Sequence, residues 1–114
     1  MAAFEIQSLG QDPSAAAAQF YSQYLPLIEI QLAAVPEPLT ILFPQADYTH
    51  AAWRLAAVQA LARKAAPQRV NAAAGGGAAA REAAVLYLAA AEGVTGQVLQ
   101  LDDAGAGPVV EPAQ

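Results

Sequence analysis

The amino-acid sequence predicts an α/β domain in which three helices connect the strands of a parallel sheet of three or four strands. Three observations predict this class. Four short segments are apolar or alternate apolar and polar residues, three longer apolar-rich segments lie between them, and proline or glycine separates most neighbours. Strands that alternate with helices are typical of parallel sheets, whose crossovers are almost always right-handed. We therefore expect one parallel sheet with right-handed crossovers.

The N-terminal part of the chain predicts a strand followed by a long helix. Residues 4–9 alternate apolar and polar side chains, which is the period of a half-exposed strand. Asp12 can cap a helix, and a proline follows it, so we expect a helix over about residues 13–34. Pro26 lies inside this helix and has no backbone donor, which predicts a kink or a break near Tyr24.

A second strand and a second helix are expected in the middle of the chain. Residues 39–43 form a short apolar run with β-branched members, and Pro44 closes it, as expected of a buried parallel strand. Asp47 can cap a helix that runs over about residues 48–66 and ends before Pro67. Apolar residues form two adjacent stripes along this helix, so one side of it is apolar.

A third strand, a third helix and a last strand are expected to follow. Residues 69–73 are expected to form the strand, and the three glycines at 75–77 then release the chain before a helix over about residues 78–91. Residues 97–101 alternate apolar and polar side chains, which predicts the last strand. We interpret the glycines as a flexible connector, although free backbone amides ahead of a helix can also bind an anion.

Length and charge restrict the domain organisation and the class of partner. The 114 residues predict a single domain over residues 1–103 and a flexible tail over residues 104–114, where apolar content is low. A domain of this size buries only about two-thirds of its unfolded surface, which favours an oligomer. The net charge of −5, with five basic residues, argues against a nucleic-acid partner.

Other features of the composition concern location and metal sites. No apolar stretch approaches the roughly 20 residues that span a membrane, and the N-terminal residues lack the pattern of a secretory signal. The chain contains no cysteine, so a cytoplasmic location is expected and a thiolate site is impossible. His50 is the sole histidine, and we interpret it as a surface or partly packed side chain. We expect no metal site.

Three motifs occur in a specific order in the second half of the chain. Tyr48 heads a helix with Ala52 four residues later, residues 69–76 read Arg-Val-Asn-Ala-Ala-Ala-Gly-Gly, and residues 95–102 read Thr-Gly-Gln-Val-Leu-Gln-Leu-Asp. These segments resemble the Tyr-x-x-x-Lys helix, the Arg-Val-Asn-x-x-x-Pro-Gly strand and turn, and the Thr-Gly-Gln-x-x-x-x-Asp strand of the short-chain dehydrogenase/reductase (SDR) family. The resemblance covers about residues 48–103, with a weaker match back to Pro13.

The resemblance implies a partial Rossmann-like fold, equivalent to the C-terminal half of an SDR domain, without a complete catalytic set. The family's glycine-rich dinucleotide loop has no counterpart, Ala52 replaces the lysine, and the segment before Tyr48 is too short for the catalytic serine. No asparagine stands at the position of the proton relay. Tyr48 is then a relic of the family's acid. We expect the chain alone to be no enzyme and to bind no cofactor.

The resemblance also implies how the chain associates. In the family, the helices equivalent to residues 13–34 and 48–66 form a bundle with a neighbouring subunit. We expect a non-catalytic subunit or scaffold that forms a homodimer or a heteromer with a full-length SDR. The interface candidates are aromatic or apolar helix residues of the kind enriched at hot spots. They are Tyr21, Tyr24, Trp53, Leu61 and Tyr87.

Two alternative functions remain open. In the first, the chain is a component of a split oxidoreductase, and a partner chain supplies the NAD(P) site while Tyr48 contributes to a shared active site. In the second, the chain is a small-ligand binding module that uses the carboxyl ends of its strands, where open α/β sheets bind their ligands.

Overall fold

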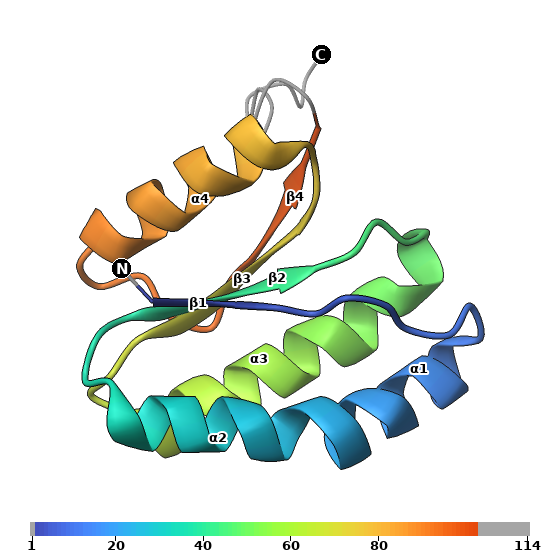
Figure 1. The fold of residues 1–114 in the computed structure, drawn as a ribbon, viewed down its shortest axis with the longest axis horizontal. Helices are drawn as coiled ribbons and strands as arrows, with labels where there is room; N and C mark the ends of the chain where they lie inside the picture. The colour runs from blue at the N-terminus through green and yellow to red at the C-terminus, as the bar shows by residue number, and fades with distance from the viewer. Residues whose placement is uncertain (1, 103–114) are drawn as a thin grey trace.

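The four strands lie side by side in the order in which they occur along the chain, and every neighbouring pair is parallel. The computed structural model describes residues 2–102, and the tail predicted for residues 104–114 lies outside them. The strands are β1 (Ala2–Glu5), β2 (Leu39–Phe43), β3 (Val70–Gly75) and β4 (Val98–Leu101). Figure 1 shows helices on both faces of this sheet. The predicted α/β class with a parallel sheet is therefore confirmed.

The first strand is earlier and shorter than the alternating pattern predicts. β1 pairs with β2 from Ala2 opposite Leu39 to Glu5 opposite Leu42, and the Ile6 amide donates one further bond to the Leu42 carbonyl at 2.9 Å. A strand needs a neighbour of matching length, and β2 has only five residues because prolines flank it. The alternation therefore continues beyond the point where pairing ends.

The first helical segment is irregular where the proline predicts it. α1 (Pro13–Gln19) starts at Asp12, whose carboxylate accepts a bond from the Ala15 amide at 2.9 Å. A π-helical turn over Phe20–Tyr24 follows, and α2 (Leu25–Ala34) begins beside Pro26. Proline has no amide hydrogen to donate to the preceding turn, although it is tolerated in the first turn of a helix. The turn before Pro26 therefore adopts the wider π-helical geometry. The chain stays helical from Pro13 to Ala34, so the irregularity expected near Tyr24 takes the form of a π-helical turn rather than a break.

The remaining helices follow the predicted ranges closely. A short 3-10 turn over Tyr48–His50 leads into α3 (Ala51–Ala65), and the Asp47 carboxylate caps it by accepting a bond from the Thr49 amide at 2.9 Å. α4 (Ala78–Ala90) follows β3. No helix within residues 2–102 is both long and apolar enough to cross a membrane.

The helices are divided unequally between the two faces of the sheet. α1, α2 and α3 cover one face, and α4 covers the other (Figure 1). The main core lies between the three helices and Leu39, Ile41 and Phe43 of β2, whereas Ala80 and Ala84 of α4 pack against side chains on the opposite face. The domain thus has three layers. Helices on both faces are what a buried parallel sheet needs.

The last crossover has the opposite hand to the first two. Each crossover moves to the next strand in the same direction across the sheet, because the strand order is sequential. Crossovers of one hand would then place every helix on one face, but α4 lies on the other (Figure 1). The prediction of right-handed crossovers throughout is therefore wrong. Side chains on the second face, including Ala73 and Leu101, are covered only because α4 lies there.

A cluster of aromatic rings fills the core at the carboxyl end of β2. The Phe20 ring lies 5.8 Å from the Phe43 ring and 5.6 Å from the Trp53 ring, measured between centroids. The Phe43 and Trp53 rings meet edge to face at 5.8 Å. Phe20 and Phe43 are completely buried. This cluster fixes the position of the first turn of α3 relative to the end of the sheet.

Candidate functional site

A cavity of about 480 Å³ opens at the carboxyl ends of β1 and β2. Its walls are the segment over residues 7–11 that follows β1, the segment over residues 44–47 that follows β2, and the side chains of His50 and Arg54. Open α/β sheets bind ligands at this edge, because the loops that follow parallel strands meet there. The cavity is the candidate binding site of the domain.

Arg54 lies on the first turn of α3 and is almost completely buried, with 3% of its surface exposed. Its Nη1 donates to the Pro44 carbonyl at 3.0 Å, and its guanidinium carbon lies 4.6 Å from the centre of the Phe43 ring. Burial lowers the pKa of Arg54 from its ordinary value because desolvation penalises the charged form. The guanidinium nevertheless stays protonated in proteins. Arg54 therefore brings a buried positive charge to the cavity.

His50 is buried, so the interpretation of a surface or partly packed side chain is wrong. Its Nδ1 lies 3.1 Å from the Trp53 indole nitrogen, and its Nε2 lies 2.9 Å from the Gln11 carbonyl oxygen. An indole nitrogen only donates and a carbonyl oxygen only accepts, so Nδ1 must accept and Nε2 must carry the hydrogen. The ring is therefore the neutral Nε2–H tautomer. Nε2 bonds to the loop after β1 and Nδ1 bonds to α3, which leaves neither nitrogen for a ligand.

Asp47 is the carboxylate on the rim of the cavity, and Thr49 engages it. The Thr49 amide and hydroxyl both donate to the same carboxylate oxygen of Asp47. The hydroxyl bond and then the amide bond hold the pKa of the Asp47 carboxyl below its ordinary value. Asp47 is thus ionised at neutral pH, and its carboxylate caps the 3-10 turn that follows it. No group of three or more His, Cys, Asp or Glu residues within the described range could hold a metal ion.

Tyr48 lies at the mouth of a second, smaller cavity and is not held in place. Its side chain is 87% exposed, and Ala52 is exposed as well. The second cavity measures about 280 Å³ and shares Asp47, His50 and Arg54 with the first. Tyr48 and Arg54 therefore line the same cavity.

The Arg-Val-Asn segment of β3 holds distant parts of the chain together. The Arg69 guanidinium donates to the carbonyls of Leu88, Ala89 and Ala91 at 2.7–2.8 Å, which caps the C-terminus of α4. Helix ends leave such carbonyls unpaired, and a cation also interacts favourably with the negative end of the helix dipole. Arg69 is therefore a structural residue.

Asn71 joins β3 to the loop that precedes β4. Its side-chain nitrogen donates to the Val94 carbonyl at 2.9 Å, and its side-chain oxygen accepts from the Gln97 amide at 3.0 Å. The Gly96 amide donates to the Val70 carbonyl at 2.7 Å in the same region. The Arg-Val-Asn and Thr-Gly-Gln motifs, which are far apart in the sequence, thus bind each other.

The glycines after β3 form a defined turn. Gly75 is the last residue of β3, so the strand begins one residue later and ends two residues later than predicted, and both Gly75 and Gly76 have a positive φ near 77°. A Cβ on Gly76 would lie 2.8 Å from the Leu101 Cβ, which only glycine avoids. A cavity of about 470 Å³ lies beside this turn.

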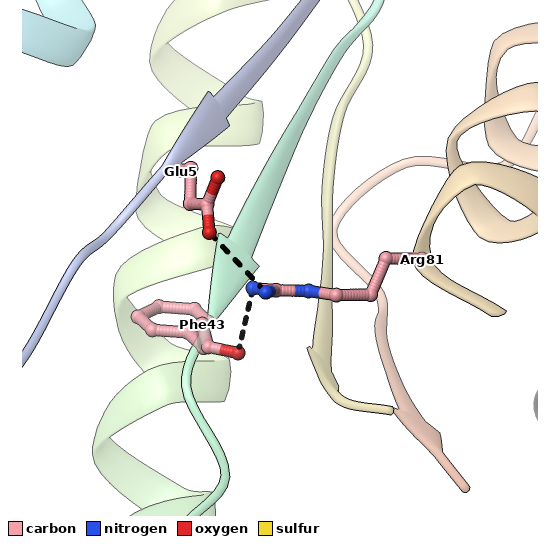
Figure 2. A network of polar contacts seen from close by, with 3 residues as sticks. All are labelled: Glu5, Phe43 and Arg81. Atoms are coloured by element: carbon pink, nitrogen blue, oxygen red, sulfur yellow. Dashed lines mark hydrogen bonds and ion pairs between the residues drawn. The ribbon is translucent and has the colours of Figure 1, made fainter. Parts of the chain in front are cut away.

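Arg81 is the charged side chain of α4 that crosses the second face of the sheet. Its Nη1 lies 3.3 Å from the Glu5 carboxylate of β1, and its Nη2 donates to the Phe43 carbonyl at 3.4 Å (Figure 2). The contact joins α4 to the first two strands of the sheet. The guanidinium of Arg81, which lies beside the glycine turn, is therefore already bonded to Glu5 and Phe43.

The interface candidates lie in different environments. Tyr21 and Tyr87 are exposed, on the α1–α3 side and the α4 side of the sheet respectively, so a single flat partner surface cannot contact both. Tyr24 is half-buried and its hydroxyl donates to the Ser8 carbonyl at 3.1 Å. Trp53 packs in the aromatic cluster, and Leu61 is buried in the main core. Leu61 therefore offers a partner almost no surface within this chain.

Two structural features were missed by the sequence reasoning. Leu27 and Ile30 of α2 are exposed, and Arg54 is buried beside a cavity. The apolar composition of α2 on all its sides was the available signal for the first. The spacing of Arg54 from the apolar residues Ala57 and Val58, three and four positions later, was the available signal for the second, since it places all three on one face of the helix.

The structure is that of an α/β protein with a parallel sheet between helical layers and a cavity at the carboxyl ends of its first two strands. A family model described as SDR-like, short chain dehydrogenase-like protein, matches residues 4–101. The chain therefore belongs to the SDR-like family. A comparison with curated proteins and a comparison with solved structures each gave no match.

Proposed function

We propose that the chain is a non-catalytic member of the SDR-like family that assembles, through the helical layer of α1, α2 and α3, with itself or with a longer SDR. The observation that carries the proposal is the surface of α2. This helix has apolar residues on all its sides, yet only Ile28 is completely buried. A helix that is apolar all round is normally buried on all sides.

The exposed part of α2 is a continuous apolar stripe. Leu27 is 52% exposed and Ile30 is 66% exposed, and residues three apart lie on the same face of a helix. Leu55 of the neighbouring α3 is also exposed. Contact with a second apolar helical surface would remove these side chains from water, which stabilises a complex by about 25 cal/mol for each Å² of apolar area.

Loss of catalysis is supported by the surroundings of Tyr48. In the family that the sequence resembles, the tyrosine equivalent to Tyr48 acts beside a lysine. Ala52 occupies the position of that lysine in this chain. Tyr48 is 87% exposed, and no described residue forms a hydrogen bond with its hydroxyl that would orient it. General acid–base catalysis depends on such positioning. Assembly is therefore a better supported role than chemistry.

Replacing Ile30 with Glu tests the proposed interface. A carboxylate in the centre of an apolar contact must be desolvated, so we expect affinity for the partner chain to fall by roughly 100-fold. Light scattering coupled to size exclusion measures the mass of the purified chain, which is 11.7 kDa as a single copy. Leu86→Glu is the matched control, since Leu86 is 50% exposed on α4 and lies on the other face.

The proposal predicts that Ile30→Glu shifts the mass to the single-copy value while Leu86→Glu leaves the assembly intact. A chain that is a single copy at every concentration and that does not bind a purified full-length SDR from the same genome would contradict it. Equal loss of assembly in both variants would place the interface elsewhere.

The second candidate function is a component of a split NAD(P)-dependent oxidoreductase. One edge of the sheet favours it, because within residues 2–102 β1 pairs only with β2, so its outer backbone groups can bind a strand of a partner chain. Such a partner would supply the cofactor site next to the cavity at the carboxyl end of β1.

Tyr48→Phe separates the two candidate functions. A phenyl ring cannot donate or accept a proton, so in a split enzyme reductase activity of the reconstituted complex should fall by roughly 100-fold or more. In a non-catalytic subunit the same variant should leave both assembly and activity of the complex unchanged. The measurement is NADPH oxidation by the purified complex, with Tyr87→Phe, another exposed tyrosine, as the control.

A further inference from the structure

Arg54 carries a buried charge for which the described chain supplies no counter-ion. No carboxylate among residues 2–102 lies within 4 Å of its guanidinium, although ion pairs of this kind join Lys64 to Glu29 and Arg81 to Glu5. Buried charges are costly and are normally paired. An anionic ligand would therefore supply the counter-charge that Arg54 lacks among the described residues.

The guanidinium also retains unused donors. Arginine has five N–H donors in a planar fork, and one of them, on Nη1, is bonded to the Pro44 carbonyl. The Nε atom is buried without a hydrogen-bond partner in the described chain. The Phe43 ring covers one side of the guanidinium and orients it. The fork is thus held in one place with donors left for a ligand.

These donors lie between two cavities. Arg54 lines the cavity of about 480 Å³ behind the β1 and β2 loops and also the cavity of about 280 Å³ beside Tyr48. The other titratable groups in these walls are engaged or neutral: Asp47 accepts from Thr49, and His50 is held as the neutral tautomer by Trp53 and Gln11. Among the described lining residues, Arg54 is the only cation.

We propose that the cavity of about 480 Å³ binds a small organic acid with a single carboxylate, which the guanidinium of Arg54 anchors. A carboxylate matches the planar fork of arginine and forms charge-assisted hydrogen bonds with it. One charge fits better than two, because the Asp47 carboxylate on the same rim repels a dianionic phosphate. The backbone and glutamine side chains of the two loops would bind the rest of the acid. This inference does not depend on the proposed assembly.

Butyrate and butyramide test the charge requirement on the full chain. They have nearly the same shape and differ in charge, so we expect butyrate to bind at least roughly tenfold more tightly, as measured by calorimetry at constant ionic strength. Trp53 is the only tryptophan, and its ring lies 5.7 Å from the Arg54 guanidinium carbon, so its fluorescence gives a second, local readout. Inorganic phosphate is titrated in parallel.

Two variants assign the effect to Arg54. Arg54→Gln keeps a polar side chain and removes the charge, so it should abolish the preference for butyrate. Arg63→Gln removes one charge from an exposed position of the same helix and should leave the preference unchanged. Circular dichroism checks the fold of each variant, and if Arg54→Gln does not fold, the comparison of butyrate with butyramide on the unaltered chain decides alone.

Each remaining outcome overturns the proposal. Equal affinities for butyrate and butyramide, or no saturable binding of butyrate, would show that Arg54 only braces the Pro44 carbonyl. Tighter binding of inorganic phosphate would refute the assignment to a carboxylate. A preference for butyrate that survives in a folded Arg54→Gln variant would show that another group recognises the charge.

Discussion

Replacing Phe20 with Ala should lower the free energy of unfolding by about 3–5 kcal/mol, the usual cost of deleting a buried phenyl ring. Phe20 is completely buried and its ring contacts both Phe43 and Trp53. The variant would leave a cavity at the junction of the π-helical turn, β2 and α3, where rigid rings allow little collapse. A small domain has a total stability of about 5–15 kcal/mol, so this loss is a large fraction of it.

Urea unfolding followed by Trp53 fluorescence measures this change. Tyr21 provides the matched control, because it is the next residue, is also aromatic and is 46% exposed. Tyr21→Ala should cost about 1 kcal/mol or less. Phe20→Leu should fall between the two, since it retains most of the buried volume. If Phe20→Ala and Tyr21→Ala lowered stability equally, the aromatic cluster would not be the centre of the core.

The second large effect is expected at Asn71. Asn71→Leu preserves the approximate volume but removes both side-chain bonds, which leaves the Val94 carbonyl and the Gln97 amide without this partner. Each lost bond costs about 1 kcal/mol, and an unsatisfied buried group costs about 1–3 kcal/mol. We expect a total loss of about 3 kcal/mol and faster hydrogen exchange in the loop before β4.

Hydrogen exchange distinguishes this local effect from a general one. Gln23→Leu, at an exposed position of the π-helical turn, is the control and should change stability by less than about 0.5 kcal/mol. The exchange rate of the Gly96 amide, which bonds to the Val70 carbonyl, should rise in Asn71→Leu before those of the β2 amides do. Unchanged exchange at Gly96 would show that Asn71 does not hold the loop.

This result would also reinterpret the family motifs. The Arg-Val-Asn and Thr-Gly-Gln segments resemble parts of a dehydrogenase, yet in this chain Arg69 caps α4 and Asn71 binds the loop before β4. Both roles stabilise the fold and need neither cofactor nor substrate. Retention of these motifs is therefore compatible with the proposed non-catalytic function.

Local signals in the sequence predicted most of the elements. β2 has the predicted bounds because prolines flank it, Asp12 caps the first turn of α1, and Asp47 caps the 3-10 turn that leads into α3. The π-helical turn that ends at Tyr24 follows from the missing amide of Pro26. Each of these features depends on residues within one or two helical turns, so short segments of sequence contain the information.

The candidate site was much less predictable. His50 was expected at or near the surface, but it is buried because the loop after β1 and the Trp53 indole each bond to one ring nitrogen. Leu61 was expected at an interface, but it packs in the main core. Arg54 was not singled out at all. The bond from the His50 ring to the Gln11 carbonyl joins residues 39 positions apart, which a pattern within one helix does not show.

By itself, the sequence determined the α/β class, the order of strands and helices, the capped helix starts and the motifs that relate the chain to the SDR family. The tertiary structure decided the bounds of β1, the face that each helix covers and the opposite hand of the last crossover. It also decided that Arg54 is buried without a counter-ion among residues 2–102. The physical reason is that capping and periodicity act between near neighbours, whereas strand pairing, burial and charge compensation depend on contacts between distant segments.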